Sequence, residues 1–209
     1  MRYTLRGMED VGELKKELYR KDLEIEELEK LVAIDPLTKL LNRRGFLELA
    51  HKLFDEIRFS GEHPGRREHF VIDSFSVLFL DIDNFKKLND SYGHGVGDKV
   101  LQFVSTVVKE KMRSSDFVGR WGGEEIVVAL IGASEGDAYI KAEEIRRAIK
   151  SRVKIPTLPN LVVTVSMGIA GLEEKVGLED LIKRADQAMY QAKQSGKDRV
   201  VKFSKLDSK

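Results

Sequence analysis

Residues 120–126 read RWGGEEI and lie between two apolar runs. Two strands joined by two glycines are typical of a tight β-hairpin, and we expect Gly122 and Gly123 to supply the positive φ angles that such turns require. Side chains alternate between the two faces of a strand, so Glu124 and Glu125 are expected to point to opposite sides. Two acids at a hairpin tip indicate a chemical site, although an ordinary solvated turn has the same composition.

The composition limits the class of protein. The chain has 209 residues, a formal net charge of +1 and no cysteine. This length suits one domain with a core plus an appendage. A net charge near zero predicts no nucleic-acid partner, and the lack of cysteine excludes disulfides and thiolate metal sites. Apolar runs reach only about six residues, too few for a membrane segment, and the N-terminus lacks a signal peptide's apolar core, so a cytoplasmic protein is expected.

Residues 8–34 carry a heptad pattern in a segment rich in Glu and Lys. Apolar residues fill all but one of the a and d positions, which are Val11, Leu14, Leu18, Lys21, Ile25, Leu28 and Val32. A helix is predicted, and its expected use is a short parallel coiled coil that forms a homodimer. An amphipathic helix packed on its own domain is the alternative. Pro36 ends or bends this helix, which divides the chain into residues 1–34 and residues 35–209.

The rest of the chain alternates between helical and strand-like periodicity. Asn42 is expected to cap the helix that follows it. A short helical turn and a glycine-rich corner are expected between Asn84 and Gly97. The longer helices are predicted at residues 43–58, 97–112, 133–151 and 178–194, and strands beside the hairpin at residues 74–80, 161–171 and 199–203. This order favours an α+β fold in which helices cover the faces of a sheet.

A carboxylate stands at the C-terminal end of the predicted strand 74–80. Asp81 follows this apolar strand directly, and Asp83 shares its parity. Ionised acids seldom occupy buried positions unless they are paired or coordinate a cation. Asp81 is therefore a candidate for metal or phosphate chemistry.

The motifs occur in the order found in the GGDEF family of diguanylate cyclases, which this chain resembles from residue 35 to about residue 203. The matching segments are residues 35–44, 81–98, 120–126 (here of the GGEE type), 164–170 and 185–197. The resemblance implies a palm-like nucleotidyl-cyclase fold, with an antiparallel-rich central sheet flanked by helices. It also implies an enzyme that condenses two GTP molecules into cyclic di-GMP and releases two pyrophosphates.

The resemblance further implies attack of a 3′-hydroxyl on an α-phosphorus, assisted by Mg²⁺ or Mn²⁺. It assigns the metal to the carboxylates of Asp81 and Glu124 and to the carbonyl of Ile82, and it gives Glu124 a part in removing the hydroxyl proton. Glu125 is expected to support the site from the other face. A second metal ligand at Asp83 is an open alternative.

Further residues match the family's substrate contacts. Asn89 and Asp98 match positions that read the guanine edge, whose N–H donors suit amide and carboxylate oxygens, and helix capping is the alternative for both. His94 matches another substrate contact or else has a structural role. The remaining nucleotide contacts are assigned to Asn84, Phe85, Lys86, Gly122, Gly123, Lys193 and Lys197. Lys197 stands where the family more often has arginine, which keeps the charge but loses bidentate geometry.

A second site is indicated by the RxxD pattern at residues 113–116. Five residues separate Asp116 from Gly122, which is the spacing of the family's product-inhibition site. Arginine can bind guanine O6 and N7 with two hydrogen bonds, and aspartate can accept from the opposite edge. Arg113 and Asp116 are therefore expected to bind cyclic di-GMP as an inhibitor, with a surface ion pair as the alternative.

Each domain of this kind offers one half-site for GTP, so the resemblance implies a catalytic homodimer. The heptad segment would hold two domains at high effective concentration. Two rival hypotheses remain: a catalytically inactive domain that acts as a receptor for GTP or cyclic di-GMP, and a cyclase with relaxed purine choice. The intact acids Asp81, Glu124 and Glu125 favour an active cyclase, and Asn89 and Asp98 favour guanine.

Overall fold

The computed structural model describes residues 15–21, 33–62, 74–173 and 176–206. The chain divides into two compact units, Met1–Ala33 and Ile34–Lys209. In the first unit, residues 15–21 are helical and their side chains are exposed. Leu18 and Lys21 of the heptad belong to this helix, and the other a and d positions lie outside the described residues. The coiled coil therefore stays a prediction.

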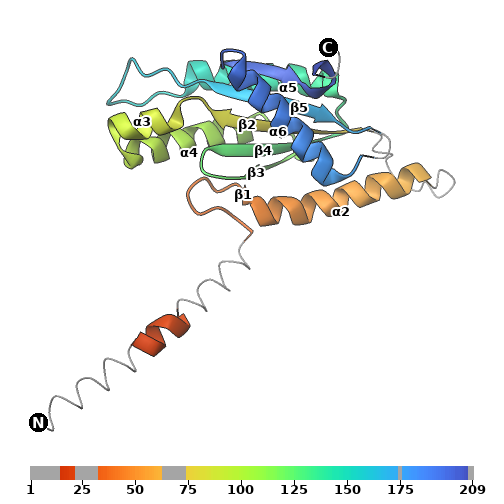
Figure 1. The fold of residues 1–209 in the computed structure, drawn as a ribbon, viewed down its shortest axis with the longest axis horizontal. Coiled ribbons are helices and arrows are strands. Elements are labelled where there is room, and N and C mark those ends of the chain that lie inside the picture. The colour runs from red at the N-terminus through yellow and green to blue at the C-terminus, as the bar shows by residue number, and fades with distance from the viewer. Residues whose placement is uncertain (1–14, 22–32, 63–73, 174–175, 207–209) are drawn as a thin grey trace, which may run out of the picture. The chain divides into compact units, whose positions relative to one another are not determined.

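The second unit is built on one six-stranded mixed sheet, with helices around the central strands (Figure 1). The strand order is β1-β3-β4-β2-β5-β6. The strands are β1 (Leu41–Asn42), β2 (Phe75–Ile82), β3 (Phe117–Arg120), β4 (Glu125–Ile131), β5 (Val165–Gly171) and β6 (Arg199–Lys202). The inner pairs are antiparallel, and only the two edge pairs, β1 with β3 and β5 with β6, are parallel. The predicted α+β class with an antiparallel-rich sheet is confirmed.

Helices cover both faces of the sheet. They are α2 (Arg43–Glu62), α3 (Phe85–Tyr92), α4 (His94–Glu110), α5 (Glu135–Arg152), α6 (Leu178–Gln194) and a 3-10 turn at Phe203–Lys205. One core cluster joins α4 and α5 to the sheet, and the other joins α2 and α6 to its opposite face. Within the described part of the chain, none of the helices combines the length and the apolar character needed to cross a membrane.

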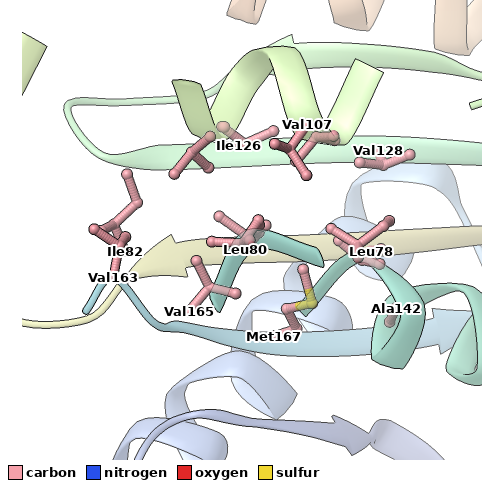
Figure 2. Packing of buried hydrophobic residues seen from close by; sticks show 14 of the residues in the cluster. Leu78, Leu80, Ile82, Val107, Ile126, Val128, Ala142, Val163, Val165 and Met167 are labelled. Carbon is pink, nitrogen blue, oxygen red and sulfur yellow. The ribbon is translucent and has the colours of Figure 1, made fainter. Parts of the chain in front are cut away.

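Strand β2 lies at the centre, and every one of its residues is buried. Leu78 and Leu80 face α4 and α5, where they pack with Val107 and Ala142 (Figure 2). Phe79, one residue along, belongs to the cluster under α2 and α6. The same alternation carries the next odd position, Asp81, to the α2 and α6 face of the sheet.

The helix starts are partly as predicted. Asn42 caps α2 as expected, because its Oδ1 accepts a hydrogen bond from the Gly45 N–H at 2.9 Å. Helix α4 begins at His94, three residues earlier than predicted. The corner before it is a single residue, Gly93, whose φ of 82° suits only glycine well.

The turn between β3 and β4 differs from the predicted two-residue hairpin. Strand β3 ends at Arg120 and β4 begins at Glu125, and positive φ angles occur at other glycines, not at Gly122 or Gly123. The Glu125 side chain lies close to Gly122 instead. A Cβ atom there would lie 2.5 Å from Oε2 of Glu125. The predicted strand at residues 161–171 is also shorter, because β5 begins at Val165 after a run of turns.

Candidate active site

Three acids gather where β2 ends and β4 begins. In the antiparallel register, Asp81 is paired directly with Glu125. Directly paired residues project from the same face of a sheet, so Glu125 shares a face with Asp81, and the prediction that Glu125 supports the site from the other face is wrong. The reason is the strand boundary: Glu124 belongs to the turn that precedes β4, where the alternation of a strand does not apply.

Asp81 is a buried acid with one cationic partner. Its side chain is 5% exposed, and Lys193 Nζ of α6 lies 2.7 Å from its Oδ2. Burial raises the pKa of Asp81 to about 6; Lys193 opposes this shift, and the charges of Glu124 and Glu125 add to it. Burial and the two neighbouring acids thus outweigh the stabilising charge of Lys193 on this carboxylate.

Arg120 holds the turn that carries Glu124. Its Nε donates to the carbonyl oxygens of Gly122 and Gly123 at 3.1 and 3.2 Å, and its Nη2 donates to Gly123 at 2.9 Å. Its Nη1 lies 3.0 Å from Oδ2 of Asp35. Burial alone would raise the pKa of Asp35, but hydrogen bonds from Thr38 and Arg120 outweigh it and lower the pKa. One charged side chain therefore fixes the shape of the signature turn.

The residues assigned to phosphate lie around the start of α3. Asn84 precedes this helix with a left-handed φ of 58°. Lys197 Nζ donates to Asn84 Oδ1 across 113 positions of sequence. Lys86 is exposed in the first turn of α3, whose free N–H groups suit an anion. Lys193 and Lys197 thus both lie near the end of β2, through their contacts with Asp81 and Asn84.

The residues assigned to guanine lie at the corner between α3 and α4. Asn89 Oδ1 is buried, and no hydrogen-bond donor for it occurs among the described residues. A Cβ atom at Gly97 would lie 1.9 Å from this oxygen, so only glycine leaves room for it. His94 and Asp98 are exposed near the start of α4. Asn89 lies inside α3, and the N-cap of α4 is Gly93, so neither Asn89 nor Asp98 is an N-cap.

The comparison with protein families agrees with this arrangement. The family described as "Diguanylate cyclase, GGDEF domain" matches residues 32–199. The chain belongs to the GGDEF-domain diguanylate cyclase family.

Curated diguanylate cyclases are 33% to 40% identical to the chain over the region that aligns with it. Diguanylate cyclase DgcM of Escherichia coli K12 is 38% identical over 177 residues, which cover 84% of this chain and 40% of that protein. Diguanylate cyclase DosC of the same strain is 40% identical over 170 residues, covering 81% of this chain and 35% of DosC. The chain therefore spans less than half the length of these relatives.

Solved GGDEF structures share the fold. The GGDEF domain of DgcB from Caulobacter crescentus, solved in complex with c-di-GMP, is 30% identical with a TM-score of 0.70; the match covers 83% of this chain and 96% of that one. The active GGEEF domain of a diguanylate cyclase from Vibrio cholerae is also 30% identical, with a TM-score of 0.63 over 78% of this chain and 97% of that one. The predicted palm-like cyclase fold is confirmed.

The acids of this GGDEF domain fit a divalent cation. Asp81, Glu124 and Glu125 place three carboxylates near Lys193, and this concentration of negative charge suits a divalent cation. In the portion of the chain that the structure describes, no three His, Cys, Asp or Glu side chains form a ready group of metal ligands. Magnesium needs few protein ligands, because waters and substrate phosphates complete its shell.

Asp83, considered above as a second metal ligand, accepts hydrogen bonds at both of its carboxylate oxygens. Its Oδ1 accepts from Ser166 Oγ at 2.6 Å, and its Oδ2 accepts from Thr164 Oγ1 at 2.8 Å and from the Asp198 N–H at 3.0 Å. Both oxygens are therefore engaged by the protein itself. These donors come from β5, the segment before it and the turn after α6, which the sequence spacing did not indicate.

The RxxD residues lie at a separate pocket of about 360 Å³, lined among others by Lys39, Lys109 and Met112. Asp116 accepts hydrogen bonds from the backbone N–H groups of Arg113 and Ile131 at 3.0 and 3.1 Å. The contact between Arg113 and Asp116 thus runs through the Arg113 backbone, while the Arg113 residue is exposed.

Two further residues adjoin the acids and were missed as site residues. Burial and the nearby charge of Asp186 raise the pKa of Glu125. Arg43 lies with its guanidinium carbon 4.4 Å from the centroid of the Trp121 ring. Glu125, Asp186, Arg43 and Trp121 all line a pocket of about 300 Å³. The seven-residue spacing of Asp186 and Lys193 on α6 was the available signal, since it places both on one helix face.

Proposed function

We propose that this GGDEF domain is an active diguanylate cyclase that condenses two GTP molecules into cyclic di-GMP and releases two pyrophosphates. The observation that carries the proposal is the buried Asp81, paired with Lys193 and adjoined by Glu124 and Glu125 at the signature turn. An inactive domain has no need to keep a costly buried acid among like charges.

The residues take roles that follow from their surroundings. Asp81, Glu124 and the carbonyl of Ile82 would hold the divalent cation, which would supply positive charge to offset the negative charge that develops in phosphoryl transfer. Glu124 accepts the proton of the attacking 3′-hydroxyl, which needs a nearby carboxylate held by a rigid turn. Arg120 supplies that rigidity through its three hydrogen bonds to the turn carbonyls.

The substrate is bound at two places. Asn89 and Asp98, with His94 beside them, receive guanine, and Oδ1 of Asn89, which has no hydrogen-bond donor among the described residues, is the acceptor for a guanine N–H. Phosphate oxygens accept hydrogen bonds from the first N–H groups of α3, near Phe85, from Lys193 of α6 and from Lys197 in the turn after α6. Lys193 forms an ion pair with Asp81, and a phosphate of GTP would give it a second anionic partner.

The reaction joins two nucleotides, so one chain supplies half of the site. Two equivalent phosphodiester bonds close the ring of cyclic di-GMP. Each bond needs the acids of one domain and a GTP 3′-hydroxyl that the facing domain holds. We infer a homodimer in which the segment 1–34 raises the effective concentration of one domain for the other.

Arg113 and Asp116 are proposed to bind the product as an inhibitor. The support is the pocket beside them, which has three cationic side chains for phosphates or guanine oxygens. Progress curves should bend as product accumulates, and Arg113→Ala should straighten them. Curves of equal shape for both proteins would count against this site.

The decisive experiment is purified full chain with GTP and Mg²⁺, with the nucleotides separated by chromatography. Cyclic di-GMP is expected, with two pyrophosphates for each product. Glu124→Gln should reduce turnover by at least about a hundredfold, because it removes both the ligand and the base. Glu144→Gln is the matched control, since this half-exposed acid of α5 forms ion pairs with Lys111, at the end of α4, and with Lys141. Binding of GTP or cyclic di-GMP by a demonstrated dimer, without any turnover, would establish the receptor instead.

A further inference from the structure

The turn after α6 contains three successive residues in the left-handed region. Gly196 has a φ of 107°, Lys197 a φ of 61° and Asp198 a φ of 45°. Glycine accepts such angles, whereas lysine and aspartate adopt them only where the surroundings compensate for the strain. The strained pair includes Lys197, the lysine assigned to phosphate.

Asp83 holds this turn from the side of the sheet. Its Oδ2 accepts the backbone N–H of Asp198 at 3.0 Å, and hydroxyls of Ser166 and Thr164 fix the same carboxylate at 2.6 and 2.8 Å. Asp83 is buried, so these hydrogen bonds form away from water. The turn is thereby tied to the central strand β2 and the neighbouring β5.

Arg146 holds the turn from the outer helix α5. Its Nη1 lies 2.5 Å from Oδ1 of Asp198, and Lys150 Nζ lies 2.6 Å from Oδ2. Glu143 in turn fixes the Arg146 guanidinium through Nε at 3.1 Å and Nη2 at 3.0 Å. Asp198 is thus fixed at its backbone by Asp83 and at its carboxylate by Arg146 and Lys150.

We propose that Asp83 and Arg146 are positioning residues for nucleotide binding, which act through Asp198 to hold Lys197 at the phosphate subsite. The observation that links them to this subsite is the hydrogen bond from Lys197 Nζ to Asn84 Oδ1, at the start of α3. The inference rests on the proposed function, in which Lys197 binds a phosphate of GTP. Neither positioning residue needs to touch the nucleotide.

The first test compares Arg146→Ala with Arg147→Ala. The Arg146 side chain is 16% exposed and bonded to Asp198, whereas that of Arg147 is 76% exposed with one 3.5 Å contact to Glu143. Without the Arg146 contact to Asp198, the KM for GTP should rise about tenfold, which is the effect of weakening one charge-assisted hydrogen bond between Lys197 and phosphate. The kcat should change less than about threefold. Arg147→Ala should match the wild type.

Asp83→Asn separates positioning from metal binding. If Asp83 is a positioning residue, the substitution should raise the KM for GTP. The Mg²⁺ concentration that gives half-maximal activity at saturating GTP should stay unchanged. A large increase in that Mg²⁺ requirement would assign Asp83 to the metal and overturn its positioning role.

The second test asks whether Arg146 acts through Lys197. Two groups that act in series are not additive, so Arg146→Ala should have less than about a twofold further effect on GTP affinity in a Lys197→Ala protein. A full tenfold further loss in that background would overturn the proposal. If Arg146→Ala does not fold, Lys150→Ala removes the other donor to Asp198 and should show the same pattern with a smaller change.

Amide hydrogen exchange provides a measurement independent of turnover. The Asp198 N–H should exchange slowly in the wild type and in Arg147→Ala, and at least about tenfold faster in Arg146→Ala. Unchanged protection would refute the hold of Arg146 on the turn. A wild-type chain that bound no GTP would refute the proposed function, whereas wild-type binding with equal affinity in Arg146→Ala would refute only this inference.

Discussion

At the scale of single residues, Asp81 carries the largest electrostatic consequence. Burial raises the pKa of Asp81 to about 6. Between its ordinary range and pH 6, the folded protein keeps a proton that the unfolded chain has lost. The contribution of Asp81 to stability therefore decreases as the pH rises through this window, and above it the folded state holds a charged acid at full cost.

Asp81→Asn should remove this cost while it keeps the shape of the side chain. Without added metal, we expect the variant to be more stable than the wild type at pH 7.5, by on the order of 1–2 kcal/mol. The difference should shrink toward pH 4, and the variant should make no cyclic di-GMP. Urea unfolding across this pH range measures the effect. A stability difference that did not vary with pH would contradict the raised pKa.

Asp83→Asn is the matched control for that experiment, since it lies two residues away. Its carboxylate accepts three hydrogen bonds, so the amide should lower stability at every pH tested. The sequence could place both acids at the end of one strand. It could not distinguish them, because the donors to Asp83 come from residues more than 80 positions away.

At the scale of elements, the corner between α3 and α4 depends on one glycine. Gly97 packs against Asn89, where a Cβ atom would meet Oδ1 at 1.9 Å, whereas Gly95 on the same helix has open space around its Cβ position. Neither has a positive φ. Substitutions at these two glycines can therefore distinguish the effect of helix propensity from the effect of packing between α4 and α3.

Gly97→Ala should displace Asn89 and lower stability by about 1–3 kcal/mol, the usual cost of an added methyl group in a packed position. The KM for GTP should rise, and discrimination against ATP should fall. Gly95→Ala should instead stabilise by about 0.5–1 kcal/mol through its helix propensity. Unfolding curves and competition between GTP and ATP provide the measurements. Equal effects of the two substitutions would contradict the role given to Asn89.

The sequence predicted elements better than it predicted what individual glycines do. Periodicity identified the longer helices and the central strand, and Asn42 was correctly assigned as a cap because its chemistry is local. The glycines of the signature were expected to serve the backbone angles of a hairpin. Gly122 instead lies against the carboxylate of Glu125. The strand boundary sets the position of that side chain, so the contact could not be read from the local sequence.

At the scale of the molecule, the sheet order explains how distant motifs meet. Strand β2 lies between β4 and β5, so its C-terminal end adjoins the signature turn on one side and the start of β5 on the other. Helix α6 crosses that face and brings Lys193 to Asp81. Sequence motifs predicted the members of this site, but the contacts among them depend on a strand order that the motifs do not encode.

A site completed by a second copy has a consequence for mixtures of chains. We expect Glu124→Gln chain, added in equal amount to wild type at saturating GTP, to lower product formation to about half, because random pairing leaves only half of the wild-type chains with a wild-type partner. Mixed pairs hold one intact acid turn and cannot form both bonds of the ring. The two proteins are incubated together before the assay so that their subunits exchange. An unrelated protein, added in the same amount to wild type, is the control. Unchanged product formation by a mixture whose mixed dimers are demonstrated would show that each chain completes the reaction alone.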